Sequence, residues 1–148
     1  MGLPGTIDIS VYNGLRDVLN RHPKITTVGF EPDSISKEFI RATIACHRIE
    51  PPTGPDSPIL EVEWRFRRDT EYYRIHYADP NTGFNCGWHR DEDHPDLGSV
   101  HFQYENQKTG KSDRTRAEFT KSVPTEILWT ALQRLFDTKI PAYTPSDR

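Results

Sequence analysis

The chain contains only two cysteines among its 148 residues, Cys46 and Cys86, which lie 40 positions apart. Because they do not form a C-x-x-C pair, the sequence argues against a disulfide framework and against a cysteine-rich zinc site. We expect both cysteines to be free, buried thiols.

Long hydrophobic runs are also missing, because the apolar stretches are far shorter than the roughly 20 residues that span a bilayer. The N-terminus has no basic region followed by an apolar stretch, so we expect no secretion signal. The net charge of −3, from 22 acidic and 19 basic residues, argues against a histone-like protein and a polybasic membrane-binding protein. We therefore expect a cytoplasmic protein without a membrane partner.

Aliphatic residues are scarce, because hydrophobic residues make up 34% of the chain and include seven Phe, six Tyr and three Trp. Aromatic rings bury large areas, so a compact core is still possible. The length fits a single domain, 1–148, with a variable N-terminal part over 1–58 and a core over 59–137. The sequence has no phosphate-binding loop, no dinucleotide-binding glycine motif and no hydrolase nucleophile elbow.

The N-terminal third predicts one helix and two extended segments. Apolar residues recur at helical spacing over 8–21, whereas 24–30 is typical of an extended chain. The segment 33–49 fits both a helix and a strand, and we favour a strand over 38–48. Four prolines between residues 50 and 58 predict a loop.

Residues 59–121 show the clearest pattern, because apolar and polar residues alternate as they do in half-buried strands. Short turns separate the strands, so we predict an antiparallel meander of about five strands, the last over 114–121. An apolar stripe after Pro124 predicts a helix that packs on one face of the sheet, and the tail from Pro141 is expected to fray. The aromatic residues predicted to face the core are Trp64, Phe66, Tyr73, Tyr77, Phe84, Trp88, Phe102 and Tyr104.

The predicted fold class is therefore α+β. It combines an antiparallel meander sheet of about five strands with a C-terminal helix packed on one face and a short N-terminal helix. One face of the sheet is left to polar side chains.

Three histidines have the outward phase of the predicted strands: His76, His89 and His101. They should share one solvated face, which Arg74 joins by the same alternation. If the turn near residue 95 keeps a simple register, His89 and His101 are opposite each other, with Cβ atoms roughly 5 Å apart. His76 should lie farther along the sheet, several residues from that pair.

Two neighbouring imidazoles suit acid–base chemistry, because both protonation states of histidine are populated near neutral pH. In metal-independent RNA cleavage, one imidazole removes the 2′-hydroxyl proton and the other protonates the departing 5′-oxygen. Arg74, with Arg116 as a weaker candidate, could stabilise the charge on the phosphoryl oxygens.

Two other interpretations of the histidines stay open. Polar histidines belong on a solvated strand face whether or not they have a function. A zinc or manganese site could use mixed imidazole and carboxylate ligands, although their spacing matches no helical zinc motif. The residues of that alternative are His89, His94 and His101 with Asp91, Asp93 or Asp96.

Charge is distributed unevenly, since 89–105 holds five acids and one base, whereas 107–121 holds five bases and two acids. The basic hairpin could follow a phosphate backbone, and an exposed tyrosine on the preceding strands could stack on a base. A charged hairpin is also common as a solvated sheet edge. The residues of this candidate nucleic-acid-binding surface are Tyr72, Lys108, Lys111, Arg114 and Arg116.

The segment 73–97 carries a His-Tyr pair in a Tyr-rich strand, then a turn, a second strand and a His-Pro-Asp element. In this pattern the sequence resembles the TumE-like proteins, toxins of prokaryotic toxin–antitoxin modules with relatives in archaea. The resemblance covers about residues 60–136. It implies a toxin that acts on RNA and is encoded with a helix-turn-helix antitoxin. The residues that match by position are His76, Tyr77, His94, Pro95 and His101.

The sequence thus supports a toxin-like, metal-independent endoribonuclease without a cofactor. Its candidate catalytic residues are His76, His89, His101 and Arg74. The alternative is a noncatalytic interaction module that binds a protein partner or nucleic acid through the polar sheet face.

Overall fold

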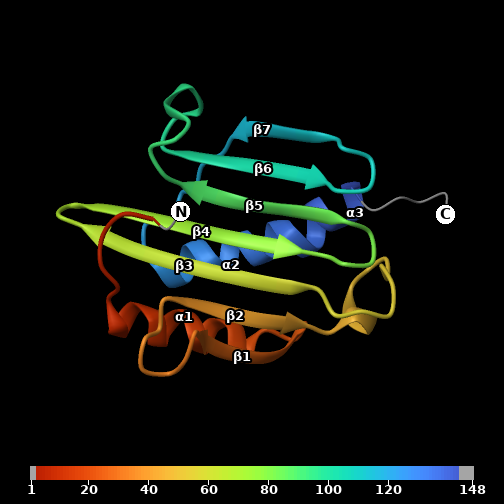
Figure 1. The fold of residues 1–148 in the computed structure, drawn as a ribbon, viewed down its shortest axis with the longest axis horizontal. Helices are drawn as coiled ribbons and strands as arrows, with labels where there is room; N and C mark the ends of the chain where they lie inside the picture. The colour runs from red at the N-terminus through yellow and green to blue at the C-terminus, as the bar shows by residue number, and fades with distance from the viewer. Residues whose placement is uncertain (1–2, 144–148) are drawn as a thin grey trace.

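A seven-stranded antiparallel sheet forms the centre of the fold, with its strands in chain order from one edge to the other (Figure 1). The computed structural model describes residues 3–143. Each strand pairs with the next one along the chain, as short connections favour. The strands are β1 (Ile25–Glu31), β2 (Phe39–Ile44), β3 (Ile59–Arg67), β4 (Thr70–Ala78), β5 (Phe84–Arg90), β6 (Val100–Asn106) and β7 (Ser112–Arg116).

The α-helices lie on one side of the sheet, and within residues 3–143 the other side carries none (Figure 1). The first helix contacts both β1 and the second helix. No helix in this part of the chain combines the length and the apolar character needed to cross a membrane. The helices are α1 (Ile9–Arg21), the 3-10 turns η1 (Cys46–Arg48) and η2 (Pro95–Leu97), α2 (Pro124–Arg134), the π-helical turn η3 (Leu135–Lys139) and α3 (Ile140–Tyr143).

The core between the sheet and the α-helices is rich in aromatic rings, as predicted. Six of the eight aromatic residues expected to face inward are buried, while Phe66 and Tyr104 pack half-buried against them. Trp88 and Phe102 pair across β5 and β6 with ring centroids 5.1 Å apart. The stripe predicted after Pro124 is also buried and consists of Ile127, Leu128, Ala131, Leu132, Leu135 and Phe136.

A capping aspartate begins α1 and a buried tyrosine anchors it to the sheet. Asp8 accepts hydrogen bonds from the N–H groups two and three residues on, so the helix begins where it was predicted. The hydroxyl of Tyr12 donates to the Glu38 carbonyl at 2.8 Å and accepts from the Trp64 N–H at 3.1 Å. The second bond satisfies a β3 donor beyond the stretch that pairs with β2.

Ahead of α1, the N-terminal segment reaches the helix-free side of the sheet. Thr6 and Phe66 exchange two backbone hydrogen bonds of 2.8 Å and form an isolated bridge at the end of β3. Gly5 has a φ of +102°, and a Cβ there would lie 2.5 Å from the Phe66 carbonyl oxygen, so the position requires glycine. This bridge carries Leu3 and Pro4 onto the helix-free side (Figure 1).

The sheet has seven strands rather than the predicted five or so, because β1 and β2 extend the meander. The inward residues Ile40, Ala42 and Ile44 are completely buried, which joins β2 to the same core. The strand favoured over 38–48 is therefore confirmed against the helix. It ends at Ile44, and η1 follows it after one residue.

β7 also differs from its prediction, because it covers 112–116 rather than 114–121. After β7 the chain turns toward the helices, and Phe119 packs 6.4 Å from the ring of Tyr73. The Arg134 guanidinium lies 4.5 Å from the Phe119 ring centroid. Contact with the core thus ends the strand early.

Two smaller predictions hold only in part. Both cysteines are free, but Cys46 is half-buried, so only Cys86 is the expected buried thiol. Burial raises the pKa of Cys86. The tail predicted to fray from Pro141 is helical to Tyr143, and the last five residues lie outside the described part of the chain.

We expect Tyr12→Phe to destabilise the fold, because it leaves the buried backbone N–H of Trp64 without a partner. An unsatisfied buried donor costs roughly 1–3 kcal/mol, so urea unfolding should show a loss of this size. Tyr143→Phe removes a hydroxyl from a half-buried ring and is the control, with an expected change below about 0.5 kcal/mol. Equal losses in the two variants would contradict the anchoring role of Tyr12.

Candidate active site

A row of basic and imidazole side chains crosses four neighbouring strands on the helix-free side, which we call the polar face. Arg74 of β4 pairs with His89 of β5, and His89 pairs with His101 of β6. His101 pairs in turn with Arg116 of β7. Directly paired residues have Cβ atoms roughly 5 Å apart, so this histidine row places two imidazoles between two guanidinium groups.

The predicted opposition of His89 and His101 is confirmed, with ring centroids 5.2 Å apart. The separation predicted for His76 is wrong, because its ring centroid lies only 6.4 Å from that of His89. His76 pairs with Gly87, which has no side chain to stand between the two rings. A Cβ at Gly87 would lie 2.2 Å from the Ile75 carbonyl oxygen, so the close strand approach requires glycine.

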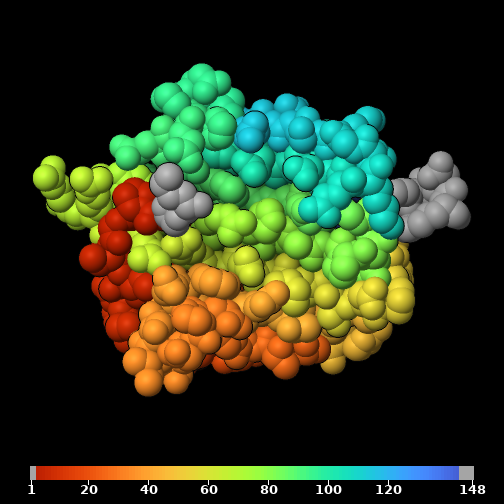
Figure 2. Space-filling model, viewed as in Figure 1, coloured from red at the N-terminus to blue at the C-terminus, as the bar shows by residue number. Residues whose placement is uncertain are grey.

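The polar face is less solvated around the histidine row than predicted. His101 is 1% exposed, and the side chain of His89 is 12% exposed. The loop after β5 brings the His94 ring to 4.9 Å from the His101 ring. Leu3 and Pro4 line a cleft of about 570 Å³ together with His89, on the face shown in Figure 2. The loop and the N-terminal segment therefore cover residues that strand alternation alone places in water.

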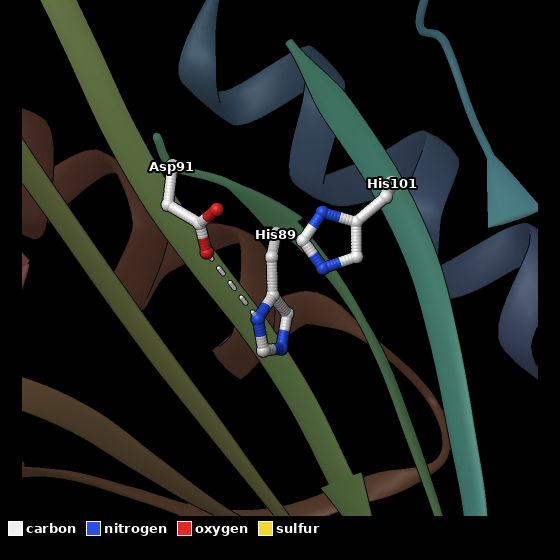
Figure 3. A group of neighbouring side chains, drawn as sticks. All are labelled: His89, Asp91 and His101. Atoms are coloured by element: carbon white, nitrogen blue, oxygen red, sulfur yellow. Dashed lines mark ion pairs between the residues drawn. The ribbon is translucent and has the colours of Figure 1, made fainter. Parts of the chain in front are cut away.

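The two central imidazoles have different partners (Figure 3). The Asp91 carboxylate lies 3.8 Å from Nδ1 of His89, while Nε2 of His101 lies 3.1 Å from Oε1 of Gln103. Within the described residues, Nε2 of His89 and Nδ1 of His76 are buried without a hydrogen-bond partner. Native proteins leave few such atoms unsatisfied, so these two nitrogens are candidates for contact with a ligand.

Burial keeps two of the histidines neutral. Desolvation, with smaller contributions from His101, Arg74 and other neighbouring bases, lowers the pKa of His89 to about 3. Desolvation and then the charge of Arg74 lower the pKa of His76 to about 4. Both imidazoles are therefore unprotonated in the free protein at neutral pH, which is the form that a general base needs.

On the strands of the polar face, positive side chains outnumber negative ones. On β2 to β7 its outward positions carry six arginines and three glutamates. Arg65 pairs with Glu63 at 2.8 Å, and Glu61 lies between Arg41 and Arg74. The arginines Arg67, Arg114 and Arg116 complete the set. With neutral histidines the strand positions of the polar face are net positive, which favours a phosphate ligand, while Asp91, Glu92 and Asp93 of the loop after β5 add negative charge to the cleft beside His89.

The structure divides the residues predicted to bind nucleic acid. Tyr72 has the outward phase but is 6% exposed, so the predicted stacking on an exposed ring is wrong. Arg114 pairs with Gln103 and lies next to the histidine row. Lys108 and Lys111 lie at the opposite end of β6, about 17 Å from His101 along the strand, so they are not part of the row.

The histidine row also contains a candidate metal-binding group. The donor atoms of His89, Asp91 and His101 lie within 4.8 Å of one another. Two imidazoles and a carboxylate are ligand types that suit zinc. Arg74 and Arg116 stand at the two ends of this group, where their charges repel a divalent cation and attract a phosphate.

Several contacts of the site were missed or assigned otherwise from the sequence. The sequence predicts Asp91 as an alternative metal ligand or as part of a hydrated loop, and the structure places its carboxylate 3.8 Å from Nδ1 of His89. His94 lies in a loop without periodicity, so strand alternation does not place it, and only the metal alternative grouped it at one site with His101. The cover by Leu3 and Pro4 is a long-range contact that local patterns do not encode.

A family match covers most of the chain, including the second half of α1, all seven strands, nearly all of α2 and the histidines. The match is to the family described as Toxin TumE, over residues 15–133. The chain belongs to the TumE toxin family. Membership of the TumE family implies a toxin of a toxin–antitoxin module, with a cognate antitoxin as partner. No curated protein and no solved structure matched the chain.

We expect acid to destabilise the protein through His76 and His89. Their folded-state pKa values are lowered, so below about pH 6.5 the unfolded chain binds protons that the folded chain does not bind until about pH 4 and pH 3. Stability is therefore fully present above pH 6.5 and should fall by about 2 kcal/mol per histidine at pH 5. Urea unfolding at pH 5.0 and 7.5 measures this loss.

Glutamine variants separate this effect from other titrations. His76→Gln and His89→Gln should each make the free energy of unfolding less dependent on pH. His47→Gln, which replaces an exposed histidine, is the control and should keep the dependence of the parent protein. The same pH dependence in all four proteins would show that the two buried histidines are not responsible.

Proposed function

We propose that this TumE-family toxin is a ribonuclease that works without a metal ion. The observation that carries this proposal is the histidine row, in which two imidazoles lie side by side between Arg74 and Arg116. A phosphodiester bound across the row would meet a positive charge at each end and a proton-transfer group at each reacting oxygen. DNA lacks the 2′-hydroxyl nucleophile, so the proposed substrate is RNA.

The proposed reaction is an intramolecular transesterification. Nε2 of His89 removes the proton of the 2′-hydroxyl, and the 2′-oxygen attacks the phosphorus. A protonated His101 gives its proton to the 5′-oxygen, so the P–O5′ bond breaks and a 2′,3′-cyclic phosphate forms. One proton is taken up and one is released, which balances the step. Asp91, 3.8 Å from Nδ1 of His89, would stabilise the imidazolium that forms there.

Substrate binding would prepare the acid for this step. A phosphodiester anion beside an imidazole favours its protonated form, which is the form that donates a proton to the leaving group. Gln103 would accept a hydrogen bond from Nε2 of His101, which leaves Nδ1 to face the leaving group. Arg74 and His76 would contact the phosphate from β4.

The remaining RNA-binding residues follow the edge of the sheet. Arg114 and Arg116 lie on β7, the exposed edge strand, and Lys108 and Lys111 lie in the turn that precedes it. A backbone that leaves the histidine row along β7 would pass these four charges. The proposed protein partner is a helix-turn-helix antitoxin, which would neutralise the toxin.

One observation favours the noncatalytic alternative. His101 is 1% exposed, so a substrate reaches it only if the loop that carries His94 moves. An interaction module would need no such motion, because its arginines already reach the surface. A ribonuclease requires the histidines for its activity, whereas a binding module requires only the arginines.

We expect His89→Gln and His101→Gln each to lower the rate of RNA cleavage by about 10²–10⁴-fold, the usual contribution of a proton-transfer group. The measurements are cleavage of RNA by the purified protein and growth arrest on its expression. His47→Gln changes an exposed histidine outside the site and should keep both activities. Unchanged toxicity in folded His76, His89 and His101 variants would leave only the binding function.

Chelation tests the metal-independent reaction. Dialysis against EDTA should leave the cleavage rate within about twofold of the untreated protein, because the imidazoles perform both proton transfers. Activity that is lost on chelation and restored by zinc or manganese would instead assign His89, Asp91 and His101 as metal ligands.

A further inference from the structure

A second cleft opens on the polar face beside the histidine row. Its volume is about 410 Å³, and both Arg74 and His76 line it. Arg74 also lines the cleft that contains His89, so the two clefts share a wall. His76 and Arg74 lie two residues apart on β4, a rise of about 7 Å, and Gly87 presents no side chain beside them. A strand of RNA could therefore occupy both clefts with consecutive groups.

A guanidinium and a carboxylate stand next to each other in the second cleft. Arg41 of β2 pairs directly with Glu61 of β3, and Nε of Arg41 lies 4.0 Å from Oε2 of Glu61. The other oxygen of Glu61 lies 3.8 Å from Nη1 of Arg74, which holds the carboxylate in place. The side chains of Arg41 and Glu61 are 49% and 29% exposed, so both reach the cleft. The pair presents hydrogen-bond donors beside an acceptor.

We propose that this cleft is a guanine subsite for single-stranded RNA. Guanine presents the complementary pattern on one edge, because its O6 accepts hydrogen bonds while N1–H and the N2 amine donate them. Arg41 would donate to O6, and Glu61 would accept from N1–H and N2. The base edge is free only in a single strand, which fixes the class of substrate.

The same pair rejects adenine. Adenine would place its N6 amine against Arg41 and its unprotonated N1 against the carboxylate of Glu61, so donor meets donor and acceptor meets acceptor. Apolar atoms of Ile59, Ala78 and Pro80 line the cleft and provide a surface for the ring. The fixed order of donor and acceptor excludes adenine and cytosine, whereas uracil presents O4 and N3–H in the same order as guanine and lacks only the N2 amine.

This subsite rests on the proposed function only for the role of the base in positioning the scissile phosphate. Binding is therefore measured without cleavage, by titrating the purified protein with the 3′-monophosphates of guanosine, adenosine, cytidine and uridine. The guanosine nucleotide should bind at least about 10-fold more tightly than those of adenosine and cytidine, and at least about 5-fold more tightly than that of uridine, which lacks one hydrogen-bond donor. Affinities within threefold of one another for all four nucleotides would overturn the proposal.

Two variants test the residues that read the base. Glu61→Gln and Arg41→Gln should each weaken binding of the guanosine nucleotide by about 5- to 100-fold, the range for losing one good base contact. Circular dichroism confirms that each variant is folded, and the exposed Arg41 gives a variant that keeps the core intact. Glu126→Gln and Arg21→Gln make the same charge changes on exposed helix positions and should leave the affinity unchanged. Unchanged guanosine binding in both cleft variants would overturn the assignment.

The outcome separates this subsite from the ribonuclease proposal. Selective guanosine binding by a protein that cleaves no RNA keeps the subsite and overturns the ribonuclease. Cleavage of RNA with no preference for guanine beside the cut keeps the ribonuclease proposal and overturns the guanine subsite.

Discussion

The register between β5 and β6 is the constraint on which the histidine row depends. Side chains alternate between the two faces of a strand, so a slip of one residue would turn an imidazole into the core. Trp88 and Phe102 oppose that slip from the inner face, because they would have to exchange the core for water. Aromatic packing on one side of the sheet thus positions His89 and His101 on the other.

Burial and charge have opposite effects on these imidazoles. Desolvation keeps His89 neutral, and the nearby Arg74 adds to this because it repels a second cation. The same arginine attracts a phosphate anion, whose negative charge would raise the pKa of His89 again. His89 and His76 would stay neutral until a phosphate arrives, so the chemistry of the site would be coupled to binding.

Strand alternation was enough to predict the sheet, the inward aromatics and the opposition of His89 and His101. Strand alternation did not predict contacts that depend on side-chain size or on residues far apart in the sequence. Gly87 lets the ring of His76 lie close to that of His89, because it has no side chain between them. Alternation gives only the face that a residue occupies, so it does not predict this contact. Tyr72 has the outward phase, yet it is only 6% exposed, and alternation does not record burial on the outer face. The strands within residues 25–44 are short and their apolar periodicity is weak. Their place in the sheet therefore could not be predicted from the sequence, and it follows from the burial of their inward residues in the core.

The bridge between Thr6 and Phe66 joins positions 60 residues apart. Closing so long a loop costs more conformational entropy than forming the adjacent hairpins, and the bridge consists of two backbone hydrogen bonds and a longer one, 3.4 Å, from the Thr6 hydroxyl to the Phe66 carbonyl. The segment with Leu3 and Pro4 should therefore dock late in folding, after β3 and β4 have paired. It should also be among the first parts to detach in local unfolding, which makes one wall of the His89 cleft the least durable.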